Sequence, residues 1–493
     1  MNKYLRSIMI WILVILIIIS IAAGISVYRS RSTKLLDRDV YKDFTAMIED
    51  AAASEDGGIA DREALTELIE DWADEHGLEY IRDYHGNIIF DKAADGRKKN
   101  VSPTLIAVSM NHLTAADNAQ VLAAAAAIAS SEIESGRRAV IFFNDDRCLG
   151  EGYRGLNEKY ITSKTKVIYL DKGDDSYIST GSFQQRWSEI SIPADREENS
   201  CDTAVRISIS GIKSGIIGPG ISGRPDPVSA LSSILTRLKS KSVVYGIAEL
   251  SIGANGNMYP DSLDVTITLN SYNLNSFTSY LDKQIREWEK DYSDSYGDIT
   301  YGYEVIEDEE AVPDTVFTRE TADAITGVLY TVRSGPYMYS ESDAIPEGRE
   351  PGDVYGINCI TDIYTGYGTI YVSMVTQGVN DLFTERICND NKTAAELYSC
   401  SYKQTDNVEA FINTRDSLSR TFMSTYERVN KSGAADMPPQ PVMDDCFTPC
   451  SYLTETNSKA DIIHLSMKGS DAARMANTVL CYIKAKGNTS IFK

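Results

Sequence analysis

Four aspartates lie beside predicted secondary-structure elements. Asp145 and Asp146 follow one short apolar run, Asp171 follows the next, and Asp117 precedes an alanine-rich segment at 118–131. A site built from such carboxylates alone would suit Mg²⁺, Ca²⁺ or Mn²⁺ better than Zn²⁺. Without a cation, clustered carboxylates would repel one another, and some would have raised pKa values. The alternative interpretation is that all four are ordinary water-exposed aspartates at strand ends and in loops.

Imidazole, a preferred ligand of zinc, is scarce in this chain. The sequence has only four histidines. His76 ends a predicted helix and His85 lies in a turn, so both are expected at the surface. His464 lies inside an apolar strand at 462–466, where it is either a hydrogen-bonded core histidine or a displaced ligand. His112 is the remaining candidate for a metal contact.

The elements that would position these residues alternate between strand and helix. Apolar runs predict strands at Leu105–Met110, Ala139–Phe143 and Val167–Leu170, and amphipathic or alanine-rich segments predict helices at 61–76 and 118–131. This alternation is typical of a parallel sheet covered by helices. Parallel strands place their carboxyl ends at one edge of the sheet, which is a good place to mount catalytic groups.

The pattern changes after about residue 204. Strands are predicted at 205–210, 243–252 and 262–269, and helices at 229–239 and 275–290. This β-α-β-β-α order predicts a small open sheet with helices on one face.

The order of elements, together with several motifs, resembles the di-zinc aminopeptidase and dipeptidase superfamily, which includes Xaa-His dipeptidase, carnosinase and peptidase T. Within it the chain most resembles Xaa-His dipeptidase, over most of residues 60–493. The motifs are Leu113–Ala119 before the alanine-rich helix, Phe142–Gly150 after a strand, Ile168–Asp171 ending a strand, Gly211–Gly218 opening the second region, and the turn Gly253–Pro260.

The resemblance implies a role for each candidate residue. Asp117 would bridge two metals, Asp146 and Asp171 would be metal ligands, and Asp145 would stand at the general-base position. Asn257 would contact substrate from the second region. An aspartate is one methylene shorter than the glutamate of the family, and a displacement of about 1 Å in a catalytic group can cost about a hundredfold in rate.

The sequence departs from the family pattern at its histidines. Met110 stands at the first ligand position, and His112 at that of the supporting aspartate. The lid histidine corresponds to Ile216, and the last ligand histidine, expected near 467–470, is missing. We therefore expect no cofactor, or at most a divalent metal: zinc by family, or an oxygen-preferring cation, held by Asp117, Asp146, Asp171 and His112.

The N-terminus contains an uncharged apolar segment, Ile8–Val27, long enough to span a bilayer as a helix of about 30 Å. A cleaved signal peptide is the main alternative, because Ala22, Ala23 and Gly24 are small, but the apolar run is longer than usual. The short preceding tail is typical of a signal-anchor with the bulk of the chain outside the cell.

The expected fold class is α/β: a metallopeptidase-type parallel or mixed sheet sandwiched by helices, with an inserted α+β lid domain and an N-terminal transmembrane helix. The predicted divisions begin with a tail at 1–7, a transmembrane signal-anchor at 8–27 and a juxtamembrane spacer at 28–59. The peptidase-like domain follows in two parts, at 60–203 and 413–493, and the lid domain at 204–412 is inserted between them.

The net charge of −23 argues against a nucleic-acid partner, which would need a basic face. The expected partners are the membrane, through 8–27, and a peptide or protein ligand, and the resemblance implies a possible homodimer through the lid. Three functions stay open: an inactive pseudopeptidase at the cell surface, an active metal-dependent dipeptidase or aminopeptidase with an Asp-rich site, and a structural envelope protein.

Overall fold

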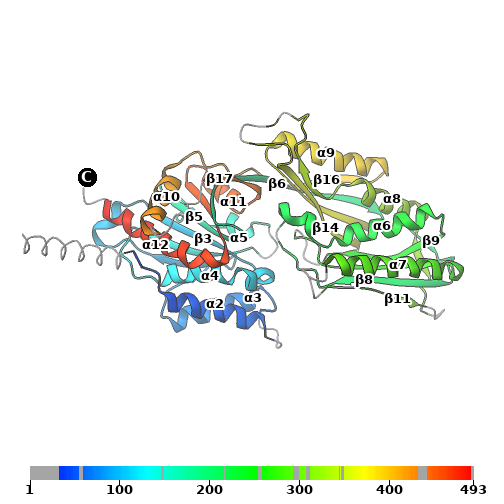
Figure 1. Cartoon of the computed structure of the whole chain (residues 1–493), viewed down its shortest axis with the longest axis horizontal. Coiled ribbons are helices and arrows are strands. Elements are labelled where there is room, and N and C mark those ends of the chain that lie inside the picture. Colours follow the sequence, from blue (N-terminus) through cyan, green and yellow to red (C-terminus); the bar gives the residue numbers. More distant parts are fainter. Residues whose placement is uncertain are drawn as a thin grey trace, which may run out of the picture.

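A computed structural model describes residues 33–54, 59–145, 149–215, 217–253, 258–292, 299–306, 311–343, 345, 349–430 and 441–489. Its described residues form two lobes, which share one long strand (Figure 1). In the first lobe the central strands are parallel and the flanking ones antiparallel. In spatial order, its strands are β1 (Ile81–Arg82), β2 (Ile88–Lys92), β4 (Arg138–Asn144), β3 (Thr104–Met110), β5 (Lys166–Lys172), β18 (Asp461–Met467) and β6 (Tyr177–Pro193), with β17 (Pro441–Phe447) beside β6.

Helices cover both faces of this sheet, which is why its central strands are almost continuous apolar runs. Alternate residues of β3 point to opposite faces: Ile106 and Val108 to one, Leu105 and Ala107 to the other. The helices of the first face are α2 (Arg38–Ala52), α3 (Arg62–Glu75), α4 (Ala115–Ser130), α10 (Ser417–Val429) and α12 (Ala472–Thr489). Those of the second face are α5 (Glu151–Arg154) and α11 (Cys450–Thr456).

After its first turn, helix α4 is apolar on nearly all sides because it is enclosed. It packs on β3, β4 and β5 with one side, and on α2 and α12 with others. A helix that is hydrophobic all round is a buried helix. Its alanines, which lack a long side chain, allow these neighbours to approach closely, and Ala123–Ala126 are fully buried.

Strand β6 connects the lobes. Its first part, around Ile178 and Ser179, pairs with β17 and β18 in the first lobe. Its second part, Gln184–Pro193, pairs with β15 (Thr369–Gly378) and β16 (Ser401–Val408) in the second lobe. The chain therefore crosses from the first lobe to the second within β6, before residue 204, where the lid domain was predicted to begin.

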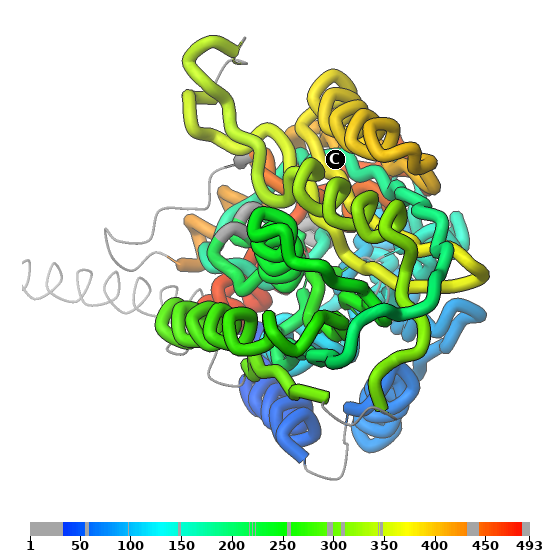
Figure 2. Tube along the Cα trace, turned by 90° about the vertical axis from the view of Figure 1, so that its right-hand side faces the viewer, coloured from blue at the N-terminus to red at the C-terminus, as the bar shows by residue number. Residues whose placement is uncertain are grey.

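The second lobe has an antiparallel sheet with helices against it. Figure 2, viewed from this lobe, shows its green helices in front of the first lobe. Outward from β6 and β15, the strands are β14 (Val354–Gly366), β9 (Tyr245–Ile252), β10 (Leu263–Leu269), β8 (Thr203–Ser210) and β11 (Thr300–Ile306), with β13 (Gly335–Met338) on β14 and a separate pair, β7 (Arg196–Glu198) and β12 (Thr315–Phe317). The helices are α6 (Pro227–Ser240), α7 (Ser271–Tyr292), α8 (Arg319–Thr331) and α9 (Asp381–Leu397).

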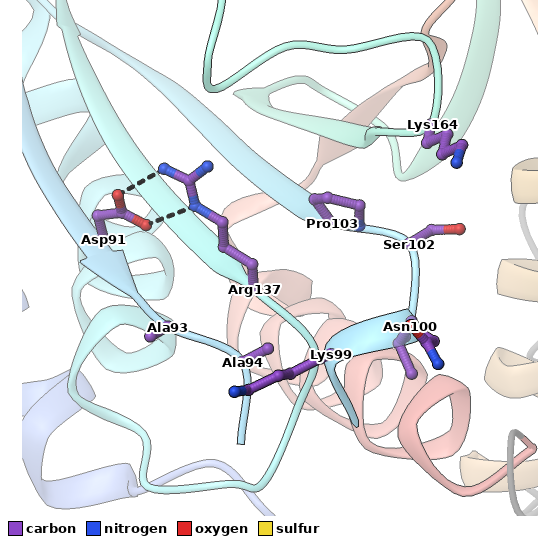
Figure 3. Close-up of a pocket in the computed structure, with 10 residues that line it drawn as sticks. Asp91, Ala93, Ala94, Lys99, Asn100, Ser102, Pro103, Arg137 and Lys164 are labelled. Carbon is purple, nitrogen blue, oxygen red and sulfur yellow. Dashed lines mark hydrogen bonds and ion pairs between the residues drawn. The ribbon is translucent and has the colours of Figure 1, made fainter. Parts of the chain in front are cut away.

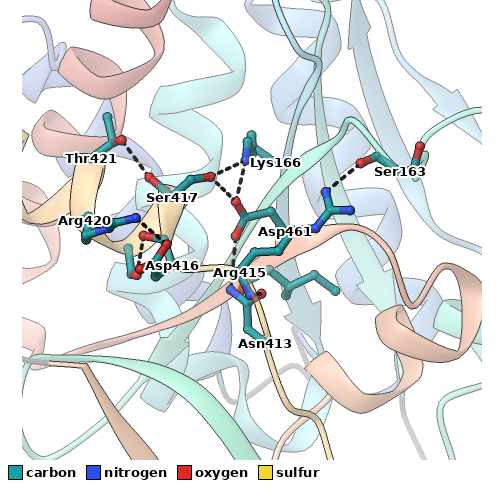
Figure 4. A network of polar contacts seen from close by, with 11 residues as sticks. Ser163, Lys166, Asn413, Arg415, Asp416, Ser417, Arg420, Thr421 and Asp461 are labelled. Carbon is teal, nitrogen blue, oxygen red and sulfur yellow. Dashed lines mark hydrogen bonds and ion pairs between the residues drawn. The ribbon is translucent and has the colours of Figure 1, made fainter.

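After the second lobe the chain returns to the first lobe at about residue 413, and a polar network binds it there (Figure 4). Asp461, at the start of β18, pairs with Lys166 at the start of β5 and accepts a hydrogen bond of 2.6 Å from Ser417 Oγ. Asn413 Nδ2 donates to Asp461 Oδ1 at 3.1 Å. Burial alone would raise the pKa of Asp461, but its bonds to Lys166, Ser417 and Asn413 lower it below its usual value. The carboxylate thus fixes the start of α10 against the sheet.

The structure differs from the prediction in the spacer segment and does not describe the predicted anchor. Residues 38–52 of the predicted spacer form α2, whose Phe44 and Ile48 are fully buried against the core, so this part is not a spacer. The predicted anchor at 8–27 lies outside the described residues. In the part of the chain that the structure describes, no helix has the length and apolar character needed to cross a membrane.

Candidate functional site

The carboxyl ends of β3, β4, β5 and β18 lie at one edge of the first-lobe sheet, because these strands run parallel in register. This edge faces the second lobe: Nδ2 of Asn111, just after β3, lies 4.0 Å from Sδ of Met258. Asn111 is also tied to the end of β4, since its Nδ2 donates to the carbonyl of Asp145 at 3.3 Å. This is the edge where the predicted site residues gather.

Asp145 is buried at this edge, with only 5% of its surface exposed. Its Oδ1 accepts a hydrogen bond of 2.8 Å from the backbone N–H of Gly150. Gly150 has a φ of +73°, and an added Cβ would lie 2.3 Å from the ring of Tyr452, so only glycine fits there. The carboxylate of Asp145 is therefore bound to the backbone at Gly150. Its neighbour Asp146 lies outside the described residues.

Asp117 and His112 lie closer to solvent. The Asp117 side chain is 59% exposed in the first turn of α4, where a negative charge is favourable at a helix N-terminus. Its Oδ1 lies 3.9 Å from Nζ of Lys172. His112 begins the short helix η2 (His112–Thr114), which Asn111 caps, and is half-buried. Asp117 thus has the surroundings of a surface aspartate.

Asp171 takes part in a buried triad. Nδ1 of His464 lies 2.7 Å from Oδ2 of Asp444, and Nε2 of His464 lies 3.3 Å from Oδ2 of Asp171. The Asp444 side chain has no exposed surface, and that of His464 is almost as deeply buried. One imidazole therefore links a carboxylate from β17 to the carboxylate at the end of β5.

The triad keeps its histidine charged. Burial would lower the pKa of His464, but the charge and hydrogen bond of Asp444 and the nearby carboxylate of Asp171 raise it from 6.5 to about 10. Burial and the same Asp444 carboxylate also raise the pKa values of the nearby Tyr177 hydroxyl and Cys450 thiol. The tyrosine and the cysteine are thus neutral, and the imidazolium supplies the positive charge between the two carboxylates.

The described residues do not fit the di-zinc site that the resemblance implies. Met110, which the resemblance places at the first histidine ligand, offers only a weak thioether. Asp145 accepts a hydrogen bond from Gly150, Asp171 contacts His464, and the largely exposed Asp117 lies near Lys172. Within the described ranges, no three His, Cys, Asp or Glu side chains are placed to hold a metal ion. The predicted lid residues Asn257 and Ile216 lie outside those ranges.

Buried polar contacts also bridge the lobes near the triad. The side chain of Gln377, on β15, accepts a hydrogen bond of 3.0 Å from the backbone N–H of Phe447, on β17. Its Nε2 donates to Gln185 Oε1 at 2.8 Å and to the carbonyl of Ile217 at 3.2 Å. These contacts fix β17, and with it the Asp444 strand, to the second lobe.

Reasoning from sequence did not identify Asp444 as a site residue. The available signal was an acidic pair inside the short apolar stretch 441–447. A charge buried in such a strand requires a partner, and His464 was the only histidine inside a predicted buried strand.

Comparison with known proteins bears on the fold. No protein-family model and no curated protein sequence matches the chain. Among solved structures, it is similar to aminoacylhistidine dipeptidase from Vibrio alginolyticus (TM-score 0.54, 15% identity, covering 92% of this chain and 98% of that one). It also aligns with aminopeptidase PepT from Bacillus cereus (0.42, 9%, 92% and 99%) and with the dipeptidase Dug1p from Saccharomyces cerevisiae (0.43, 11%, 93% and 98%). Of these three TM-scores, only the value of 0.54 is high enough to indicate a shared fold. It confirms the resemblance at the level of the fold: the chain has the fold of aminoacylhistidine dipeptidase.

Proposed function

We propose that this chain is a membrane-anchored pseudopeptidase, which keeps the fold of a di-metal peptidase without its zinc chemistry and binds a peptide or protein at the cell surface. The loss of zinc chemistry is inferred from the described residues of the site. The membrane anchor is inferred from the apolar segment Ile8–Val27.

One observation carries the proposal: Asp171, which the resemblance places at a metal-ligand position, has its Oδ2 3.3 Å from Nε2 of the buried His464. A protonated histidine between the buried carboxylate of Asp444 and the partly exposed carboxylate of Asp171 provides a positive charge where a metal would otherwise lie. Met110, which replaces the first histidine ligand, supports the same conclusion. The imidazolium of His464 therefore offsets part of the carboxylate charge at this site without zinc.

Metal content and turnover test the proposal together. The full chain, purified in detergent and dialysed against micromolar zinc, is expected to hold less than stoichiometric zinc by mass spectrometry and to hydrolyse no Xaa-His dipeptide. The Vibrio alginolyticus dipeptidase, treated in the same way, is the positive control. Two tightly held zinc ions per chain, or turnover, would refute the proposal and favour an active Asp-rich site containing Asp145 and Asp146.

A structural envelope protein is the second candidate, and the contact between Asn111 and Met258 favours it, because the lobes touch at the edge where a ligand would enter. Binding of a dipeptide and tripeptide library to the full chain, measured by the shift in melting temperature, separates the two functions. A stabilising peptide supports the pseudopeptidase, and none across the library supports the structural protein.

The anchor and the dimer have their own tests. Resistance of the full chain to alkaline extraction from membranes is expected if Ile8–Val27 spans the bilayer, and release into the supernatant would contradict it. Light scattering of the detergent-purified chain checks the homodimer that the resemblance implies.

A further inference from the structure

The chain enters the first lobe at a fixed point on α12. Asn477 Nδ2 donates to the carbonyl of Thr33 at 2.8 Å, and its Oδ1 accepts from the backbone N–H groups of Leu35 and Leu36 at 2.8 and 3.1 Å. The six residue steps from Val27, the last residue of the proposed anchor, to Thr33 span at most about 20 Å. The first lobe is therefore held next to the bilayer.

The amino edge of the first-lobe sheet lies beside this entry point. Leu35 and Lys98 line one pocket of about 800 Å³, and Lys99 and Pro103, which precedes β3, line the next, of about 630 Å³. Lys98 is neutralised by Glu134 at 3.3 Å. Because the second lobe adjoins the opposite edge of this sheet, we infer that the amino edge faces the membrane (Figure 1).

The second of these pockets has an excess of positive charge (Figure 3). Its Arg137 and Asp91 neutralise each other through hydrogen bonds of 3.1 and 2.7 Å. Lys99 and Lys164 are exposed at opposite rims, and no ion pair joins either of them to a described residue. Two uncompensated lysines contrast with a chain whose net charge is −23.

We propose that this edge, through Lys99 and Lys164, binds the anionic headgroups of the bilayer that holds the anchor, and so sets the orientation of the first lobe. The inference rests on the proposed anchor. Each lysine near an anionic surface favours association by about fivefold, so the pair favours it by about 25-fold. In a chain that is already anchored, this preference decides which face of the first lobe is turned toward the membrane. The acidic surface of the rest of the chain is repelled by the anionic lipid.

The experiment uses the full chain in nanodiscs of phosphatidylcholine, with and without 30% phosphatidylglycerol. Hydrogen exchange is followed by mass spectrometry in segments 93–103 and 159–166. The test variant is Lys99→Glu with Lys164→Glu, and the matched control is Lys213→Glu with Lys241→Glu. All four lysines are exposed, so the two variants change the net charge equally.

The expected result is severalfold slower exchange of both segments in the anionic nanodiscs, lost in the test variant and in high salt, and kept in the control variant. Equal exchange in both lipids, or equal loss in both variants, would overturn the inference while leaving the anchor intact. A chain that fails to enter nanodiscs and is released by alkaline extraction would overturn the anchor itself and the inference with it.

Discussion

Replacing Asp444 by asparagine tests whether the buried triad carries charge. The substitution keeps the shape of the side chain but leaves the imidazolium of His464 with Asp171 alone, which is less buried and 3.3 Å away. Removing one partner of a buried ion pair costs about 3–5 kcal/mol. A rise in pKa from 6.5 to about 10 corresponds to roughly 5 kcal/mol shared between the two carboxylates, so we expect a loss of about 3 kcal/mol.

Urea unfolding of the full chain in detergent, followed by tryptophan fluorescence, measures this loss. Asp174→Asn is the control, because Asp174 is exposed and its replacement should change the free energy of unfolding by less than about 0.5 kcal/mol. A double-mutant cycle with His464→Gln isolates the coupling between the two side chains. A coupling near zero would refute the account of a charged triad, even if each single variant were destabilised.

Three further predictions concern stability, each measured by urea unfolding. Because the pKa of His464 is raised in the fold, its contribution is complete below pH 6.5 and is lost as the pH rises through about 10, so the wild-type chain and His464→Gln should converge in alkali. Asp461→Asn, which leaves a lysine unpaired, should cost about 3 kcal/mol near pH 7. The pKa of Asp461 is lowered, so this difference should fade in acid, below its usual value of 3.8. Gly150→Ala should cost about 3 kcal/mol through strain and contact with Tyr452, whereas Gly77→Ala, at a φ of +63° with open space around it, should cost about 1 kcal/mol.

Much of the first lobe could be predicted because its strands are buried on both faces. The runs at Leu105–Met110 and Ala139–Phe143 fall within β3 and β4, which each extend one residue or so further. Helix α5 was less predictable from its sequence because it is a single turn, which ends at Arg154 before Gly155. Helix α9 was not predicted, because its apolar positions are few and widely spaced among charged residues.

The site was less predictable because strand pairing between distant segments decides it. The position of Asp171 at a strand end follows from a local apolar run. Its partner His464 comes from β18, which pairs with β5 although 295 residues separate Lys166 from Asp461. Asp444 comes from β17, which pairs with β6. A local pattern contains no information on which of several acidic residues will meet a histidine after such long-range pairing.

The single strand shared by the two lobes has a thermodynamic consequence. Each lobe relies on β6 for pairing within its own sheet, and the buried contacts of Gln377 reinforce the junction. Neither lobe can lose its sheet without removing a hydrogen-bonded edge from the other. We therefore expect the two halves to melt as one cooperative unit, so that a destabilising change in the triad also destabilises the second lobe.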